Sequence, residues 1–198
     1  IGSPSFSPDG RRIAFTVTAA NGISLWVAAV DSGPVEALTG PVLNATLGQP
    51  CVWSPDGADL YCLFVPEGRG AAPEAPRVPV GPNVHVSEGH ASPAPTYEDL
   101  LQNPHDERLF DHYFTARLGR VSVATRAVAW LGEPGLFDGV DPSPNGQYLL
   151  VQRLHRPYSY TVPSGLFPRA IEVWDRDGRL VRRIADLPLG ERIPMRGV

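Results

Sequence analysis

Lysine is absent from this sequence of 198 residues, and all 17 of its Lys or Arg positions are arginine. The arginines are scattered singly and in pairs, and the formal net charge is −4. A nucleic-acid-binding surface needs clustered cations, so no nucleic acid is expected as a partner. We interpret the missing lysine as a coding bias towards Arg, Ala, Gly and Pro rather than as a set of phosphate-binding guanidinium groups.

Cysteine and long apolar runs are also scarce. Cys51 and Cys62 are the only cysteines, which is too few for a disulfide framework or a four-cysteine metal site. No apolar run reaches the ~20 residues that a membrane span requires, so no membrane partner is expected. A charged-then-apolar signal peptide is likewise missing. Hydrophobic residues make up 42% and charged residues 19% of the chain, which is a globular composition and excludes a disordered chain.

The sequence also lacks the common motifs of catalysis. It has no Gly-x-Ser-x-Gly nucleophile elbow. It has no His-Glu-x-x-His segment, glycine-rich phosphate loop or Cys-x-x-Cys pair. His105 and His112 could share one face of a helix, but zinc normally takes three or four protein ligands. We therefore expect no metal, no cofactor and no catalysis by this chain alone.

A repeated turn segment is present and sets the expected architecture. It occurs as Ser7-Pro8-Asp9-Gly10, Ser54-Pro55-Asp56-Gly57 and Ser143-Pro144-Asn145-Gly146. Proline at the second position and glycine at the fourth are type I turn chemistry. Each turn precedes a run with apolar residues at alternate positions, which predicts a strand with one buried face.

Aligning the three runs predicts which side chains form that face. The aligned positions are Ile13, Phe15 and Val17, then Leu60, Cys62 and Phe64, then Leu149, Val151 and Arg153. Cys62 therefore lies on the buried face, and we interpret it as a small core residue rather than a reactive thiol.

Further strand-like runs complete each unit as a four-stranded antiparallel meander. The sequence predicts an all-β fold: a partial β-propeller of about three four-stranded antiparallel blades, at about residues 1–45, 46–134 and 135–190. Three blades do not close a ring, because propellers typically have about four to eight. Open blades also leave strand edges unprotected. We therefore expect the natural protein to continue beyond both ends.

The middle blade carries a Pro-rich and helical insertion at 66–118, between its second and third strands. Its prolines, which keep this stretch extended, are Pro66, Pro73, Pro76, Pro79, Pro82, Pro93 and Pro95. A helix is expected after them. Thr96 with Asp99 resembles a capping box, and Asn103-Pro104 is typical of an N-cap followed by the first helical position. The apolar stripe of this helix is Leu109, Phe110, Tyr113 and Phe114.

The third blade has a shorter insertion, 155–168, at the same place in the meander. The second-to-third loops of a meander emerge opposite the Ser-Pro-Asp-Gly turns, so both insertions are expected on one face. Loops on a rigid scaffold often carry function, and this face is where we expect a partner or substrate.

Several segments resemble, in their order, the glutamyl endopeptidase branch of the prolyl oligopeptidase family. They are Asn103-Pro104-His105-Asp106-Glu107, Leu109-Phe110-Asp111-His112-Tyr113, Asp141-Pro142-Ser143-Pro144, Tyr148-Leu149-Leu150, His155-Arg156-Pro157-Tyr158-Ser159, Val162-Pro163, Gly165 and Phe167-Pro168. The resemblance covers about Val65 to Pro194. It implies an N-terminal propeller that caps a C-terminal α/β-hydrolase domain of the same parent chain. That domain, which is not present here, would carry the Ser-Asp-His triad of a serine-type endopeptidase.

The resemblance also implies a peptide substrate cleaved after glutamate, with the propeller gating access and shaping the substrate chamber. A glutamate side chain in a closed site needs a cation, and a guanidinium suits a carboxylate best. Arg153 breaks the apolar pattern of its strand, and a charge at such a position must find a partner or reach solvent. We predict that Arg153 or Arg156, with His155 nearby, lies towards the chamber and binds acidic substrates.

Three alternatives stay open. Arg153 simply extends from the strand end into solvent. The His-Arg-Pro-Tyr segment is structural and pairs with the domain below it. The chain is part of a stand-alone β-propeller that binds a protein partner, since propellers host many functions. The insertion motifs favour the peptidase, and the coding sequence downstream of Val198 would distinguish the two functions.

Overall fold

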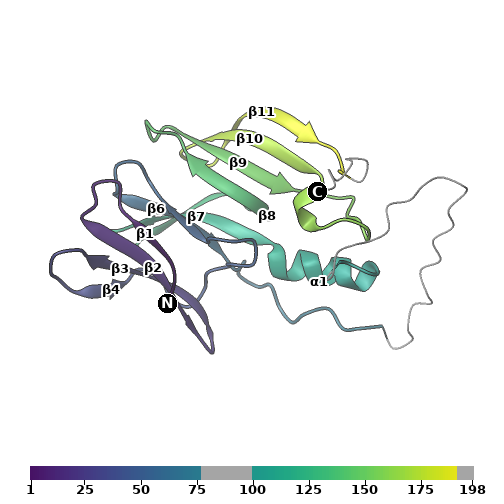
Figure 1. Cartoon of the computed structure of the whole chain (residues 1–198), viewed down its shortest axis with the longest axis horizontal. Coiled ribbons are helices and arrows are strands. Elements are labelled where there is room, and N and C mark those ends of the chain that lie inside the picture. The colour runs from purple at the N-terminus through teal and green to yellow at the C-terminus, as the bar shows by residue number, and fades with distance from the viewer. Residues whose placement is uncertain (77–99, 191–198) are drawn as a thin grey trace, which may run out of the picture.

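The computed structural model describes residues 1–76 and 100–190, which form two antiparallel sheets (Figure 1). The first sheet has the order β1-β2-β3-β4, with β1 (Gly2–Phe6), β2 (Arg12–Ala19), β3 (Gly22–Ala29) and β4 (Val35–Ala37). The second has seven strands: β5 (Cys51–Trp53), β6 (Asp59–Phe64), β7 (Ala116–Ser122), β8 (Val128–Pro142), β9 (Tyr148–Leu154), β10 (Arg169–Asp175) and β11 (Leu180–Leu187). The all-β propeller architecture predicted from the sequence is confirmed.

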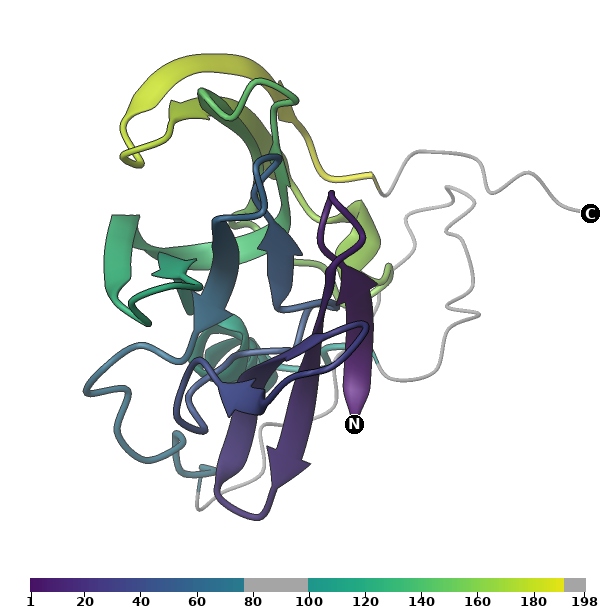
Figure 2. The same cartoon turned by 90° about the vertical axis from the view of Figure 1, so that its left-hand side faces the viewer.

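Strand β8 joins what the sequence presents as two separate blades. Its first part pairs with β7, from Val121↔Val128 to Ala116↔Gly135. Its second part pairs with β9, from Leu136↔Leu154 to Pro142↔Leu149. One long strand therefore ends one four-stranded meander and begins the next, and the sheet curls strongly between them (Figure 2).

The three repeated turns have the same hydrogen bonds, as their sequences predict. In each turn the glycine N–H donates to the serine carbonyl, at 2.8, 2.9 and 2.7 Å for Gly10, Gly57 and Gly146. The serine hydroxyl donates to the Asp or Asn side chain at 2.6–2.7 Å and accepts the N–H of the strand that follows. The three glycines have φ near +69°, a region in which a side chain is strained. This bonding also holds the pKa of Asp9 and Asp56 below its usual value, mainly through the serine hydroxyl.

The core lies between consecutive units, and β6 contributes to it from both faces. Leu60, Cys62 and Phe64 pack against the first sheet. Tyr61, on the other face, packs towards the third unit. Blade faces packed against one another in this way are the main apolar burial of the fold.

One prediction about the buried faces is wrong for β2. Ala14 and Thr16 are its buried residues, whereas Ile13, Phe15 and Val17 are only half-buried. The alignment picks out the face equivalent to Leu60 and Cys62, which in β6 packs against the preceding unit. In β2 that face points away from the second sheet.

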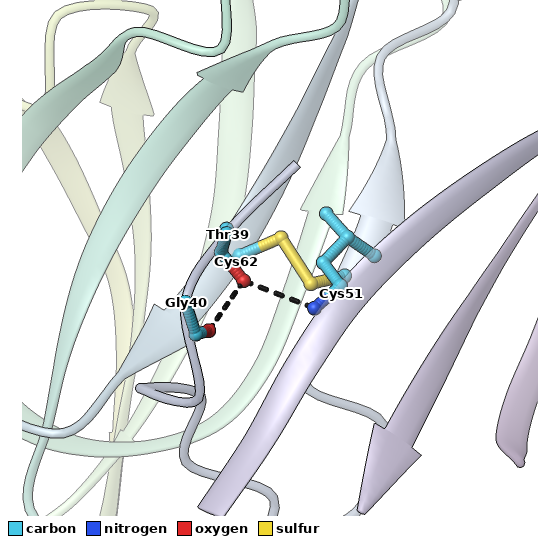
Figure 3. The surroundings of a disulfide bond; sticks show 5 residues. Thr39, Gly40, Cys51 and Cys62 are labelled. Atoms are coloured by element: carbon cyan, nitrogen blue, oxygen red, sulfur yellow. Dashed lines mark hydrogen bonds between the residues drawn. A yellow bond between two sulfur atoms is a disulfide. The ribbon is translucent and has the colours of Figure 1, made fainter. Parts of the chain in front are cut away.

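The two cysteines form a disulfide, which the sequence analysis does not anticipate. Cys51 on β5 and Cys62 on β6 lie directly opposite each other, with their Cα atoms 4.1 Å apart. Cys62 is fully buried, which confirms it as a core residue. Figure 3 shows the bond beside Thr39 and Gly40, where the Thr39 hydroxyl donates to the Gly40 carbonyl. The bond therefore lies at the junction of the first two units.

Candidate functional site: the insertion face

Helix α1 (Pro104–Phe114) begins where the sequence predicts. Asn103 is its N-cap, and its side-chain oxygen accepts the N–H groups of His105 and Asp106 at 2.8 and 3.1 Å. The acidic residues Asp106 and Glu107 in the first turn stabilise the helix, because negative charge interacts favourably with the positive end of the helix dipole. α1 follows β6 and leads into β7, as expected for an insertion between the second and third strands. The capping pair Thr96–Asp99 and the prolines Pro79, Pro82, Pro93 and Pro95 lie outside the described residues.

The two insertions pack against each other through an aromatic cluster. Phe110 of α1 is buried against Tyr158 and Phe167 from the 155–168 insertion, with ring centroids 5.1 and 5.7 Å apart. Tyr158 and Phe167 stack on each other at 5.1 Å. Leu136 and Leu154 complete the cluster from β8 and β9. Two segments that are separate in sequence thus form one surface, which we call the insertion face.

Arg156 links the two insertions through ion pairs with carboxylates of α1. Its guanidinium donates through Nη1 to the Glu107 carboxylate and through Nη2 to Asp111 Oδ2, the latter at 2.7 Å. Tyr158 donates its hydroxyl to Asp111, and Tyr160 donates to Glu107 Oε1 at 2.9 Å. We call these five residues the arginine clasp. Every carboxylate in it is paired with a cation and a tyrosine.

The environment of the clasp fixes its protonation. Burial first, and then the hydrogen bond to Asp111, raise the pKa of Tyr158 well above its usual value, so the hydroxyl remains a donor. The hydrogen bonds to Asp111 and then Glu107 raise the pKa of Arg156, which is charged in any case. Arg156 is therefore engaged within the fold, by two carboxylates of α1.

His155 is also held by neighbours. Its Nε2 lies 2.7 Å from Asp186 Oδ1 on β11, and its Nδ1 lies 2.8 Å from the Arg156 carbonyl. The hydrogen bond to that carbonyl raises the pKa of His155, and Asp186 adds to the effect. His155 therefore joins the start of the insertion to the outer strand of its own unit.

Arg153 lies in a different environment. It is on β9, opposite Phe137 and Ala170, and its side chain is half-buried. The guanidinium carbon is 5.6 Å from the Phe137 ring centroid and 5.8 Å from that of Trp174. Within residues 1–76 and 100–190, no hydrogen-bond acceptor or carboxylate pairs with this guanidinium. The cation at this apolar-patterned position is therefore held by rings and not by an anion.

A cavity of about 590 Å³ lies beside the insertion face. Its walls come from α1, from the two residues Leu100 and Leu101 that precede it in the chain, and from the 155–168 insertion. They are mainly apolar and include Leu101, Leu109, Phe110, Phe114, Val162 and Phe167. Apolar cavities of this size accommodate side chains or small ligands. Apolar contacts, rather than charge, would hold whatever occupies it.

Within residues 1–76 and 100–190, no three His, Cys, Asp or Glu side chains come close enough together to hold a metal ion. No helix in those two ranges has the length and apolar character needed to cross a membrane.

Sequence reasoning missed the partners of the predicted site residues. Glu107, Asp111 and Asp186 hold Arg156 and His155, and the sequence pattern predicts this role for none of the three. A signal was available for two of them, because Glu107 and Asp111 are four residues apart and so share one face of the helix. Nothing in the sequence pattern marks Asp186.

Two plant proteins are similar to this chain in amino-acid sequence. The chain is 38% identical, over 201 aligned residues and 96% of its length, to a probable chloroplastic glutamyl endopeptidase of Oryza sativa subsp. japonica. It is 39% identical, also over 96% of its length, to the protein of the same name from Arabidopsis thaliana. It spans only about a fifth of these relatives, 21% and 20% of their lengths. No family model matches the chain.

Solved structures match the fold at low sequence identity. The propeller domain of the trilobed protease from Pyrococcus furiosus has a TM-score of 0.53 at 9% identity, covering 94% of this chain and 42% of that one. Acylaminoacyl peptidase from Pyrococcus horikoshii has a TM-score of 0.52 at 15% identity, covering 93% and 25%. TolB from Acinetobacter baumannii matches with a TM-score of 0.53 at 14% identity, covering 93% and 32%. These structural matches show the propeller fold. The sequence identity to the plant proteins shows the similarity to glutamyl endopeptidases. The resemblance to glutamyl endopeptidases that the sequence motifs predict is therefore confirmed: the chain is related in sequence to a stretch of the plant glutamyl endopeptidases, and its fold is that of a β-propeller.

Proposed function

We propose that this chain is the propeller part of a longer serine peptidase that cleaves peptides after glutamate. The observation that carries the proposal is the 38% identity to a probable glutamyl endopeptidase over 96% of the chain. Catalysis would come from an α/β-hydrolase domain elsewhere on the parent polypeptide, because these 198 residues contain no nucleophile elbow. The chain itself would be non-catalytic.

The insertion face would form a wall of the substrate chamber. The arginine clasp and the aromatic cluster support this role, because they fix α1 against the 155–168 insertion in one rigid layer. A rigid layer over a chamber limits access by size, since only a short or unfolded peptide fits beneath it. The propeller would thus act as a gate for substrates.

Cations on this face would suit the glutamyl side chain. Arg153, Arg156 and His155 are the candidate substrate-binding residues, and all three lie at or beside the start of the 155–168 insertion. A buried carboxylate needs a cationic partner, and a guanidinium offers a bidentate one.

The test is hydrolysis by the full-length protein that contains this chain. Matched peptides with glutamate, glutamine or aspartate at the cleaved position would be compared, first as short peptides and then within a folded protein. We expect cleavage after glutamate in the short peptides and little in the folded protein. A variant without the catalytic serine is the control. Absence of hydrolysis, or equal cleavage after glutamate and glutamine, would reject the proposal.

A gating role predicts a second result with the same protein. Arg156→Ala removes the cation of the clasp and should loosen α1, so longer and partly folded substrates should be cleaved faster than by the wild type. Arg126→Ala removes an arginine from an exposed ion pair with Glu36 on the first two units and should leave the size limit unchanged.

A further inference from the structure

Arg153, beside the insertion face, is a half-buried cation with which no anion pairs in the described residues. The neighbouring cations are engaged: Arg156 by Glu107 and Asp111, His155 by Asp186, and Arg169 by Asp138 at 2.8 Å. Exposed arginines without a partner, such as Arg108 on α1, are ordinary because water solvates them. A half-buried guanidinium is different, because burying a charge without a partner is costly.

The surroundings hold the Arg153 guanidinium in place without using its donors. Phe137 and Trp174 contact it through their rings, an attraction that leaves N–H groups free at the edge of the guanidinium plane. Gly135 allows its close approach, since a Cβ atom built there would lie 2.6 Å from Nη2 of Arg153. The side chain is therefore oriented before any ligand arrives, which reduces the entropy cost of binding.

Arg153 is also correctly placed along the chain. It precedes Leu154, the last residue of β9, and the 155–168 insertion follows directly. It therefore lies at the end of the strand that opens onto the insertion face. A carboxylate that reached the guanidinium would meet N–H donors that no described acceptor occupies, backed by the rings of Phe137 and Trp174.

We propose that Arg153 is the specificity residue that receives the glutamyl carboxylate of the substrate, while Arg156 and His155 position the insertion around it. This inference rests on the proposed function and narrows its three candidate residues to one. Arg156 would have to break its ion pairs with Glu107 and Asp111 before it could bind a substrate carboxylate, whereas Arg153 has no ion pair among the described residues to break.

The experiment compares kcat/KM for two peptides that differ only in glutamate or glutamine at the cleaved position, using the full-length enzyme. For Arg153→Ala we expect the glutamate-to-glutamine ratio to fall at least about tenfold, the range expected for a lost charged hydrogen bond. Arg153→Lys keeps the charge but not the bidentate geometry and should retain part of the ratio. Arg156→Ala should change both peptides by the same factor.

Two further variants separate recognition from folding. Gly135→Ala keeps Arg153 but displaces its guanidinium, and should lower the ratio while leaving the melting temperature close to that of the wild type. Arg117→Ala removes another ring-stacked arginine, 4.5 Å from the Trp130 ring, and should leave the ratio unchanged.

The outcomes distinguish the two claims. A wild-type enzyme that prefers glutamate, together with Arg153→Ala and Gly135→Ala variants that keep the preference, would overturn the role of Arg153 and leave the proposed function standing. A wild-type enzyme without a preference for glutamate would remove the proposed function, and this inference with it.

Discussion

Arg156 donates to Asp111 across 45 residues of sequence, with Nη2 and Oδ2 2.7 Å apart. The contact connects an insertion of one propeller unit to the insertion of the next. It forms because both loops leave the seven-stranded sheet on the same side, where α1 offers two carboxylates one helical turn apart. The insertion face is thus one surface made of two loops, and the predictions below depend on that surface and on the units that carry it.

Loss of Asp111 should loosen helix α1. Asp111→Ala leaves the Tyr158 hydroxyl and one side of the Arg156 guanidinium without an acceptor, at a cost of about 1–3 kcal/mol. Hydrogen exchange measured by mass spectrometry should show faster exchange in the α1 peptides than in the wild type. Glu36→Ala, which breaks an exposed pair with Arg126, should cost at most about 1 kcal/mol. Unchanged exchange in α1 would show that the clasp does not hold the helix.

The bond between His155 and Asp186 should weaken as pH rises. The pKa of His155 is raised above 6.5 in the folded chain, first by the Arg156 carbonyl and then by Asp186. The folded state therefore binds the proton more tightly than the unfolded state. The resulting stabilisation is fully present below the unfolded pKa and is lost as pH rises through the folded pKa. The difference in melting temperature between wild type and His155→Gln should be largest in mild acid and shrink above neutrality; a difference independent of pH would contradict this.

The repeated turns should differ in their contribution to stability although they share the same bonds. Ser54 is only 4% exposed, whereas Ser143 lies in an exposed turn. Ser54→Ala leaves the partly buried Asp59 N–H without its acceptor and should lower the free energy of unfolding by about 1–2 kcal/mol. Ser143→Ala should cost less, because water can replace the hydroxyl. Urea denaturation of the two variants measures the difference, and equal losses would refute the argument from burial.

The disulfide between Cys51 and Cys62 should be detectable and stabilising. Peptide mapping without reductant should find the two cysteines linked, with neither labelled by a thiol reagent. A cross-link over 11 residues of chain constrains the unfolded state by about 2–3 kcal/mol. A dithiol reductant should lower the wild-type free energy of unfolding by that amount and leave a Cys51→Ala/Cys62→Ala double variant unchanged. Free thiols in the unreduced protein would contradict the pairing.

Local patterns predicted the parts of the fold that local forces determine. The three turns followed from their proline, glycine and serine positions. The start of α1 followed from Asn103-Pro104. In both cases the stabilising hydrogen bonds join residues only a few positions apart. The local sequence therefore includes both the donor and the acceptor of each bond.

Most of the missed features depend on contacts between distant segments. The cysteine pairing is the exception, because the turn that pairs Ser54 with Asp59 sets the register of β5 against β6 and so places Cys51 opposite Cys62. The partners of Arg156 and His155 lie on α1 and β11, on different elements from the arginine and histidine they hold. The buried side of β2 depends on which neighbouring unit covers it, because a propeller blade has a neighbour position on each face.

The most direct test of the whole account is an experimental structure of the full-length protein with a glutamyl peptide analogue bound covalently to the catalytic serine. The account predicts that the insertion face, with α1 and residues 155–168, lies over the bound peptide, and that the glutamyl carboxylate contacts the Arg153 guanidinium. A structure with the Ser-Pro-Asp-Gly turns facing the catalytic serine, or with the glutamyl carboxylate bound only by residues of the catalytic domain, would contradict it.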